Sequence, residues 1–211
     1  MAKKEKSRKL TAAEARRLAH FETLCADLQS QGYKKTDLTI SMTRASVAVI
    51  IAIIPLSFVF IGLFVWLNPD TLFKLDLDEI VLLILAIIAL TIAHEFVHGI
   101  TWSLFSEHGM KDIEFGIMWN TLSPYCTCAS ALPRSSYIIG ALMPLVVTGL
   151  VPTVIALAIG SPWLLALGFV MTLSAGGDIM IVFKLLAHHS DANEILWYDH
   201  PTEGGGVIFE R

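Results

Sequence analysis

Residues 94–98 read His-Glu-Phe-Val-His, and this H-E-x-x-H motif carries the clearest chemistry in the chain. On a helix, positions i and i+4 lie on one face, one turn apart, so His94 and His98 can meet a single Zn²⁺ ion at about 2 Å each. Glu95 would lie beside the ion without binding it. From there it could take a proton from a water that the metal activates and pass it to a leaving amine.

A catalytic zinc usually has three protein ligands and one open position, so the motif needs a further ligand. Asp178 is the best candidate, because it is the acidic residue inside the apolar stretch 162–187. His94 and Asp178 each lie fifteen residues from the predicted span ends at Glu79 and Trp163, which places both about 22 Å from that surface. The competing candidates for the third ligand are Glu114, His188, His189 and Glu194.

The motif lies in a chain of 211 residues that is 55% hydrophobic, with its apolar residues in long runs. The runs long enough to span a bilayer as helices are 46–67, 79–105, 136–160 and 162–187. We therefore predict an all-α polytopic membrane protein with four transmembrane helices and a small β-leaning cytoplasmic loop. Glycines and prolines in the 106–135 loop exclude a helix there, and short β-leaning pieces are expected at 112–119 and 125–131.

The basic residues gather in the first 44 residues, which predicts a cytoplasmic N-terminus in a multi-pass protein of the cell membrane. Four spans would return the C-terminus to the cytoplasm. The predicted parts are a basic, amphipathic segment (1–44), a four-span metalloprotease-like domain (45–188) and a cytoplasmic tail (189–211) with a turn and one short strand. A basic block can also bind nucleic acid, but no motif for that accompanies it.

A helix is expected ahead of the first span, because Thr11 and Glu14 fit a capping box. Its apolar face would lie on the bilayer or on the domain, and it would consist of Leu18, Phe21, Cys25 and Leu28. Cys126 and Cys128 form a C-x-C pair in the 106–135 loop. We interpret them as two small half-buried residues, with a redox or metal-delivery role as the alternative.

With these residues in place, the chain resembles intramembrane metalloproteases of the site-2 protease kind. It resembles more closely a bacterial family of uncharacterised membrane proteins described as zincin peptidases. The resemblance covers residues 80–210 and rests on the segments HEFVHG, GALMP, SAGGD and YDHP. One departure from site-2 proteases is that Ile179 follows Asp178, where those enzymes usually have glycine.

The resemblance implies that His94, His98 and Asp178 bind Zn²⁺ and that Glu95 is the general base. The loop after the motif would offer a strand edge to an unwound substrate, with Ile113, Phe115 and Ile117 as the candidate edge. We expect a zinc-dependent intramembrane endopeptidase that cleaves a membrane-anchored protein or peptide near the cytoplasmic face of the lipid bilayer.

Two other classes of function compete with this prediction. One is a non-catalytic membrane adaptor or chaperone that retains the fold, although the intact Glu95 argues against a decayed site. The other is a small metal-binding or transport protein, which the lack of repeat symmetry disfavours.

Overall fold

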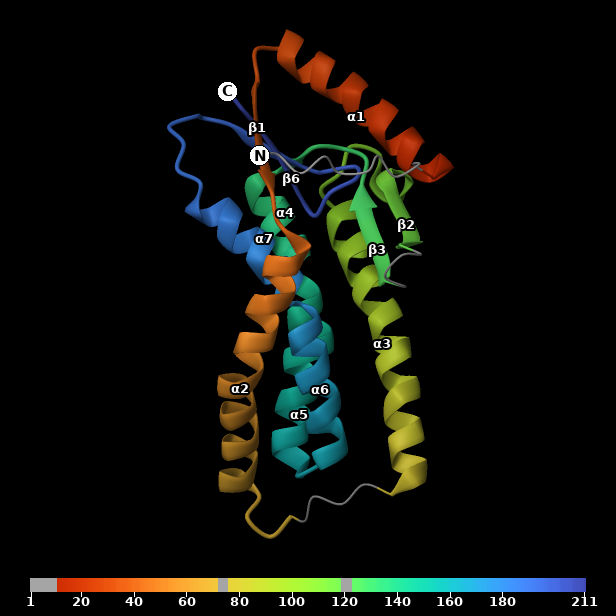
Figure 1. Cartoon of the computed structure of the whole chain (residues 1–211), viewed down its shortest axis with the longest axis vertical. Helices are drawn as coiled ribbons and strands as arrows, with labels where there is room; N and C mark the ends of the chain where they lie inside the picture. The colour runs from red at the N-terminus through yellow and green to blue at the C-terminus, as the bar shows by residue number, and fades with distance from the viewer. Residues whose placement is uncertain (1–10, 72–75, 119–122) are drawn as a thin grey trace, which may run out of the picture.

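The computed structural model describes residues 11–71, 76–118 and 123–211, and its long helices run side by side with a sheet at one end (Figure 1). Among these described residues, three helical segments are long and apolar enough to cross a membrane: Ser46–Leu67, Leu77–Ser103 and Arg134–Ile159. The first lies within α2 (Met42–Leu67), and the second is α3 (Leu77–Ser103). These bounds confirm long apolar helices where spans were predicted at 46–67 and 79–105, with the second helix ending at Ser103.

The third span changes its helix type halfway. It consists of α4 (Arg134–Pro144), a π-helical segment η2 (Leu145–Leu150) and α5 (Val151–Ile159). A π-helical turn is rare and often marks a functional position, because the wider turn changes which side chains point inward. Here it carries Thr148, whose side chain is almost completely buried.

The fourth apolar stretch is broken into α6 (Pro162–Ser174) and α7 (Gly176–Ala187), which meet at an angle of 42°. The pair makes a fourth span if it is counted as one. Gly176 lies at the break, where a Cβ atom would come within 2.4 Å of Val49 in α2. Glycine therefore lets α2 and α7 approach closely, and the break leaves Asp178 in the first turn of α7.

At the other end of the spans, the indole N–H of Trp163 donates a hydrogen bond to the carbonyl of Glu79 at 3.1 Å. This contact holds the starts of α3 and α6 at one level. The two positions are the span ends from which the sequence predicted equal depths for His94 and Asp178.

An antiparallel four-stranded sheet lies at the opposite end of the bundle, in the order β1-β6-β5-β4. Its strands are Lys34–Thr39 (β1), Leu132–Pro133 (β4), Ile195–Asp199 (β5) and Gly205–Glu210 (β6). The prediction of an all-α fold is therefore wrong in this respect: the protein is mostly helical but contains sheets. The tail also forms two strands where one was predicted.

The predicted N-terminal helix is α1 (Ala12–Ser30), and the Thr11–Glu14 capping box is present. Its buried residues Phe21 and Leu28 pack with Tyr33, Tyr198 and Phe209. Of the two surfaces considered for this helix, its apolar face thus covers the sheet, as the position of α1 above the bundle in Figure 1 illustrates.

A hairpin follows α3 after a short 3₁₀ turn, η1 (Gly109–Asp112). Its strands are β2 (Ile113–Met118) and β3 (Ser123–Cys128), which confirms the two β-leaning pieces; Trp119, the predicted end of the first, lies outside the described residues. A Cβ atom on Gly99 would lie 2.5 Å from the Phe115 ring. The absence of a side chain at Gly99 therefore lets the hairpin lie directly against α3.

Candidate metal centre

The structure brings His94, His98 and Asp178 together, although α3 and α7 are far apart in sequence. The Nε2 atoms of His94 and His98 lie 3.2 and 3.5 Å from Oδ2 of Asp178, and one ligand atom from each residue lies within 4.8 Å of the others. Ligand atoms around a tetrahedral zinc ion are about 3.3 Å apart. The separations therefore fit a metal ion bound by two imidazoles and one carboxylate.

Both imidazole rings direct Nε2, rather than Nδ1, toward Asp178. The carbonyl oxygen of Gly140 can only accept, so the Nδ1–H of His98 donates to it at 2.9 Å. The Thr148 hydroxyl donates to the carbonyl of Pro144 at 2.8 Å, which leaves its oxygen to accept from His94 Nδ1 at 3.5 Å. With Nδ1 protonated on both rings, each Nε2 keeps a free lone pair for a metal.

The orientation of both imidazoles thus comes from the third span. Gly140 stands in α4, and a Cβ atom there would lie 2.1 Å from the Trp102 indole, so glycine allows its carbonyl to reach His98. Thr148 lies on the π-helical segment. The role of the Gly140 carbonyl was not predicted from the sequence, because the residue type says nothing about which backbone groups bind a side chain. The GALMP segment, which contains Gly140, was the sequence feature that could have indicated it.

The sequence also predicts a polar cavity at the site, lined by Thr148, Thr172, Ser174 and Tyr137. Of these four residues, only Thr148 contacts a candidate ligand in the described structure. Thr172 donates to Gly168, Ser174 is exposed and donates to Met171, and Tyr137 donates to Asp199. The predicted polar lining therefore reduces to a single threonine that holds a histidine.

Glu95 follows His94 on α3 and is half-buried. It does not belong to the three-residue group. Its carboxylate interacts with the backbone N–H of Cys126 in β3 and with the charges of both histidines and Asp178. Glu95 therefore lies between the candidate metal group and the hairpin, where a reacting group could reach both.

The competing third ligands all lie elsewhere. His188 pairs with Glu210 and Glu194 pairs with Arg211, each at 2.9 Å. His189 is exposed, and Glu114 lines a small pocket beside Arg16 and Arg17. Within residues 11–71, 76–118 and 123–211, the one group of three metal-binding side chains is therefore the His94, His98 and Asp178 group.

Cys126 and Cys128 are free thiols, half-buried and buried respectively. Burial raises the pKa of Cys128 to about 12 and raises that of Cys126 as well. A thiol that stays protonated is a poor metal ligand and a poor nucleophile. This agrees with the interpretation of the C-x-C pair as small packing residues.

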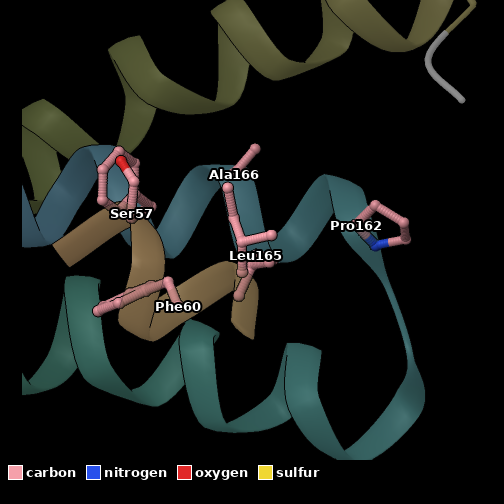
Figure 2. A pocket seen from close by; sticks show the side chains of 7 residues that line it. Ser57, Phe60, Pro162, Leu165 and Ala166 are labelled. Carbon is pink, nitrogen blue, oxygen red and sulfur yellow. The ribbon is translucent and has the colours of Figure 1, made fainter. Parts of the chain in front are cut away.

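A pocket of about 370 Å³ between α2 and α6 takes no part in this chemistry (Figure 2). Its lining is apolar apart from Ser57, whose hydroxyl donates within its own helix to Ile53 at 2.8 Å. None of the candidate metal ligands borders it. Its lining suits hydrocarbon, and the reactive groups of the protein lie elsewhere.

Replacing Thr148 with valine is expected to weaken zinc binding by about 10- to 100-fold, because His94 loses the acceptor that fixes its ring. Competition with a chromogenic chelator measures the affinity. Thr153→Val is the matched control, since Thr153 is also buried in the same helical segment but its hydroxyl donates to the Gly149 carbonyl at 2.9 Å. Equal affinities in the two variants would show that Thr148 does not orient His94.

A family model described as "Putative zincin peptidase" matches residues 87–192, half of the chain. The matched segment includes the H-E-x-x-H motif, the hairpin, the third span and Asp178. No curated protein and no solved structure matches the chain. The broader likeness to site-2 proteases remains a prediction from the sequence.

Proposed function

Because the chain belongs to the zincin peptidase family, we propose that it is a zinc-dependent endopeptidase that cleaves membrane-anchored proteins. The observation that carries this proposal is the group of His94, His98 and Asp178 with both Nε2 atoms free to bind a metal. A bound zinc ion supplies the Lewis acidity that makes water nucleophilic near neutral pH.

In this mechanism Glu95 handles the proton. It follows His94 and lies close to the candidate ligands, so its carboxylate accepts a proton from the attacking water. It then delivers that proton to the leaving amine as the peptide bond breaks. The Thr148 and Gly140 acceptors hold the two imidazoles in place while this occurs.

A transmembrane substrate must unwind before its peptide bonds become accessible, and an extended chain can be held by adding it to a strand edge. Ile113 and Phe115 of β2 were the first candidates for this edge, together with Ile117. Ile113 and Phe115, however, pack toward Gly99 of α3, whereas the backbone N–H of Cys126 in β3 interacts with Glu95. We therefore propose the outer edge of β3 as the substrate edge.

The site lies toward the end of the bundle that carries the sheet, since His94 is about 26 Å along α3 from Leu77. The basic N-terminal segment favours a cytoplasmic location for this end. Cleavage is accordingly proposed near the cytoplasmic face of the cell membrane, with both the N-terminal segment and the tail on that side.

The test is to purify the full chain in detergent, measure zinc per chain, and follow hydrolysis of a library of fluorogenic peptides with and without 1,10-phenanthroline. The proposal expects about one zinc per chain and hydrolysis that the chelator abolishes and added zinc restores. A folded protein that binds no zinc would overturn the proposal and favour a non-catalytic membrane adaptor. Zinc binding without hydrolysis of any peptide or reconstituted membrane substrate would also favour the adaptor.

A further inference from the structure

Asp199 is a carboxylate that the proposed reaction does not use, and it connects three separate elements. Its Oδ1 accepts from the Tyr137 hydroxyl in α4 at 2.9 Å and from the Trp197 indole in β5 at 3.0 Å. Its Oδ2 accepts from the Thr127 hydroxyl in β3 at 3.2 Å. A carboxylate away from bulk water is costly unless donors satisfy it, and these three donors do so.

One of these bonds leads to the candidate substrate edge. Thr127 is the neighbour of Cys126, whose backbone N–H interacts with Glu95. The hairpin of β2 and β3 has no further strand within the described residues. The Thr127–Asp199 bond is therefore a direct polar link from β3 to the four-stranded sheet.

The other bonds anchor Asp199 to a buried row of aromatic rings. The Tyr137 ring stacks on Trp102 with a centroid distance of 5.3 Å and contacts Trp197 in a tilted arrangement at 4.8 Å. Trp102 in turn stacks on His98 at 4.8 Å. Trp102, Tyr137 and Trp197 are all buried. The Asp199 carboxylate is thus fixed relative to the candidate metal ligands. Through its bond with Thr127 it can fix the position of β3 relative to those ligands as well.

We infer that Asp199 is a positioning residue that holds the outer edge of β3 at a set distance from Glu95 and the metal group. This inference rests on the proposed function, since it concerns how that site receives an extended substrate. Asp199 itself touches neither the candidate ligands nor Glu95 through any bond described above. Its effect passes through Thr127 to the strand.

The natural cysteines report the position of β3 without any need for a substrate. Cys126 and Cys128 lie on that strand, and Cys25 lies on α1 as an internal reference. Burial raises the pKa of both β3 thiols, so their alkylation requires the strand to move away from its packing. Rates are measured on the full chain in lipid nanodiscs with N-ethylmaleimide, peptide by peptide, by mass spectrometry.

Thr127→Val keeps the shape of the side chain but removes the bond to Asp199. We expect alkylation of Cys126 to accelerate by about tenfold or more relative to Cys25, as loss of a hydrogen bond to a charged group implies. Thr36→Val, the same change on the half-buried Thr36 of β1, is the matched control and should leave the ratio unchanged. An unchanged ratio in Thr127→Val, or an equal rise at Cys25, would overturn the inference.

Two variants of Asp199 separate positioning from general stability. Asp199→Asn retains an acceptor for Tyr137 and Trp197 and can donate to the Thr127 oxygen, so it should keep the wild-type ratio. Asp199→Leu removes all three bonds and should accelerate Cys126 more than Thr127→Val does. If Asp199→Leu does not fold, Thr127→Val and Asp199→Asn still decide the question.

Measurements of zinc content and hydrolysis distinguish a failure of the positioning role of Asp199 from a failure of the proposed function. The proposed function fails if the wild-type chain binds no zinc, whatever the cysteines do. The positioning inference fails if a wild type that binds zinc shows the same Cys126 protection as Thr127→Val. Where hydrolysis is measured, Thr127→Val should raise KM at unchanged zinc content and unchanged kcat, a split that loss of overall stability does not produce.

Discussion

Replacing Glu95 with glutamine is expected to leave zinc bound and to lower kcat for peptide hydrolysis by about 10²- to 10⁴-fold. Glutamine has nearly the same shape as glutamate and still accepts from the Cys126 N–H that interacts with Glu95. It cannot accept a proton from the attacking water. The loss should therefore fall on kcat, with zinc content equal to that of the wild type.

Glu114→Gln is the matched control for this experiment. Glu114 is also half-buried and belongs to the adjacent hairpin. It lines a small pocket beside Arg16 and Arg17, which contains none of the candidate metal ligands. Its replacement should leave kcat close to the wild-type value. Wild-type hydrolysis by Glu95→Gln would mean that another group moves the proton, and the proposed role of Glu95 would have to be abandoned.

Replacing Asp178 with asparagine is expected to lower zinc affinity by more than about 100-fold, the upper end of what losing a supporting partner of a ligand costs. Asp178 offers the carboxylate oxygen that lies 3.2 and 3.5 Å from the two Nε2 atoms. Without that negative charge, two neutral imidazoles would have to hold a divalent cation inside the helical bundle. Chelator competition measures the change directly.

Glu194→Gln tests the alternative that Glu194, and not Asp178, is the third metal ligand. Glu194 was a competing third ligand in the sequence, but in the structure it pairs with Arg211 at 2.9 Å. Its variant should bind zinc like the wild type and should keep its hydrolytic rate. If Asp178→Asn keeps full zinc affinity, the third ligand is a different residue and the group of three does not describe the site.

The long apolar helices were predicted well from the sequence, because a helix of this kind depends on residues that are close together in the chain. The central turns of α2 and α3 are apolar, so helix type and length follow from nearby residues. The equal depth of His94 and Asp178 was also predictable, because two helices that begin at one surface and run in the same direction reach equal depth after equal numbers of residues. The Trp163–Glu79 contact supplies that common level.

The sheet was missed because its cause is not local. β1 reads Lys-Lys-Thr-Asp-Leu-Thr, which looks like a solvated basic segment, and it becomes a strand only by pairing with β6 near the other end of the chain. The π-helical turn at Leu145–Leu150 was missed for a related reason. Pro144 marks an interruption, but which side chain it turns inward depends on the packing of the neighbouring helices.

The central position of β6 has a consequence for how the protein is made. Residues 205–210 leave the ribosome after every other element that the structure describes, yet β6 separates β1 from β5 in the sheet. Until then β1 has no partner, and α1 lacks the Phe209 surface on which it packs. The membrane helices can bring the candidate ligands together during synthesis, whereas Asp199 and the sheet behind it arrive last. During synthesis the candidate metal ligands can therefore meet before Asp199 is present to bind Thr127 and fix the position of β3.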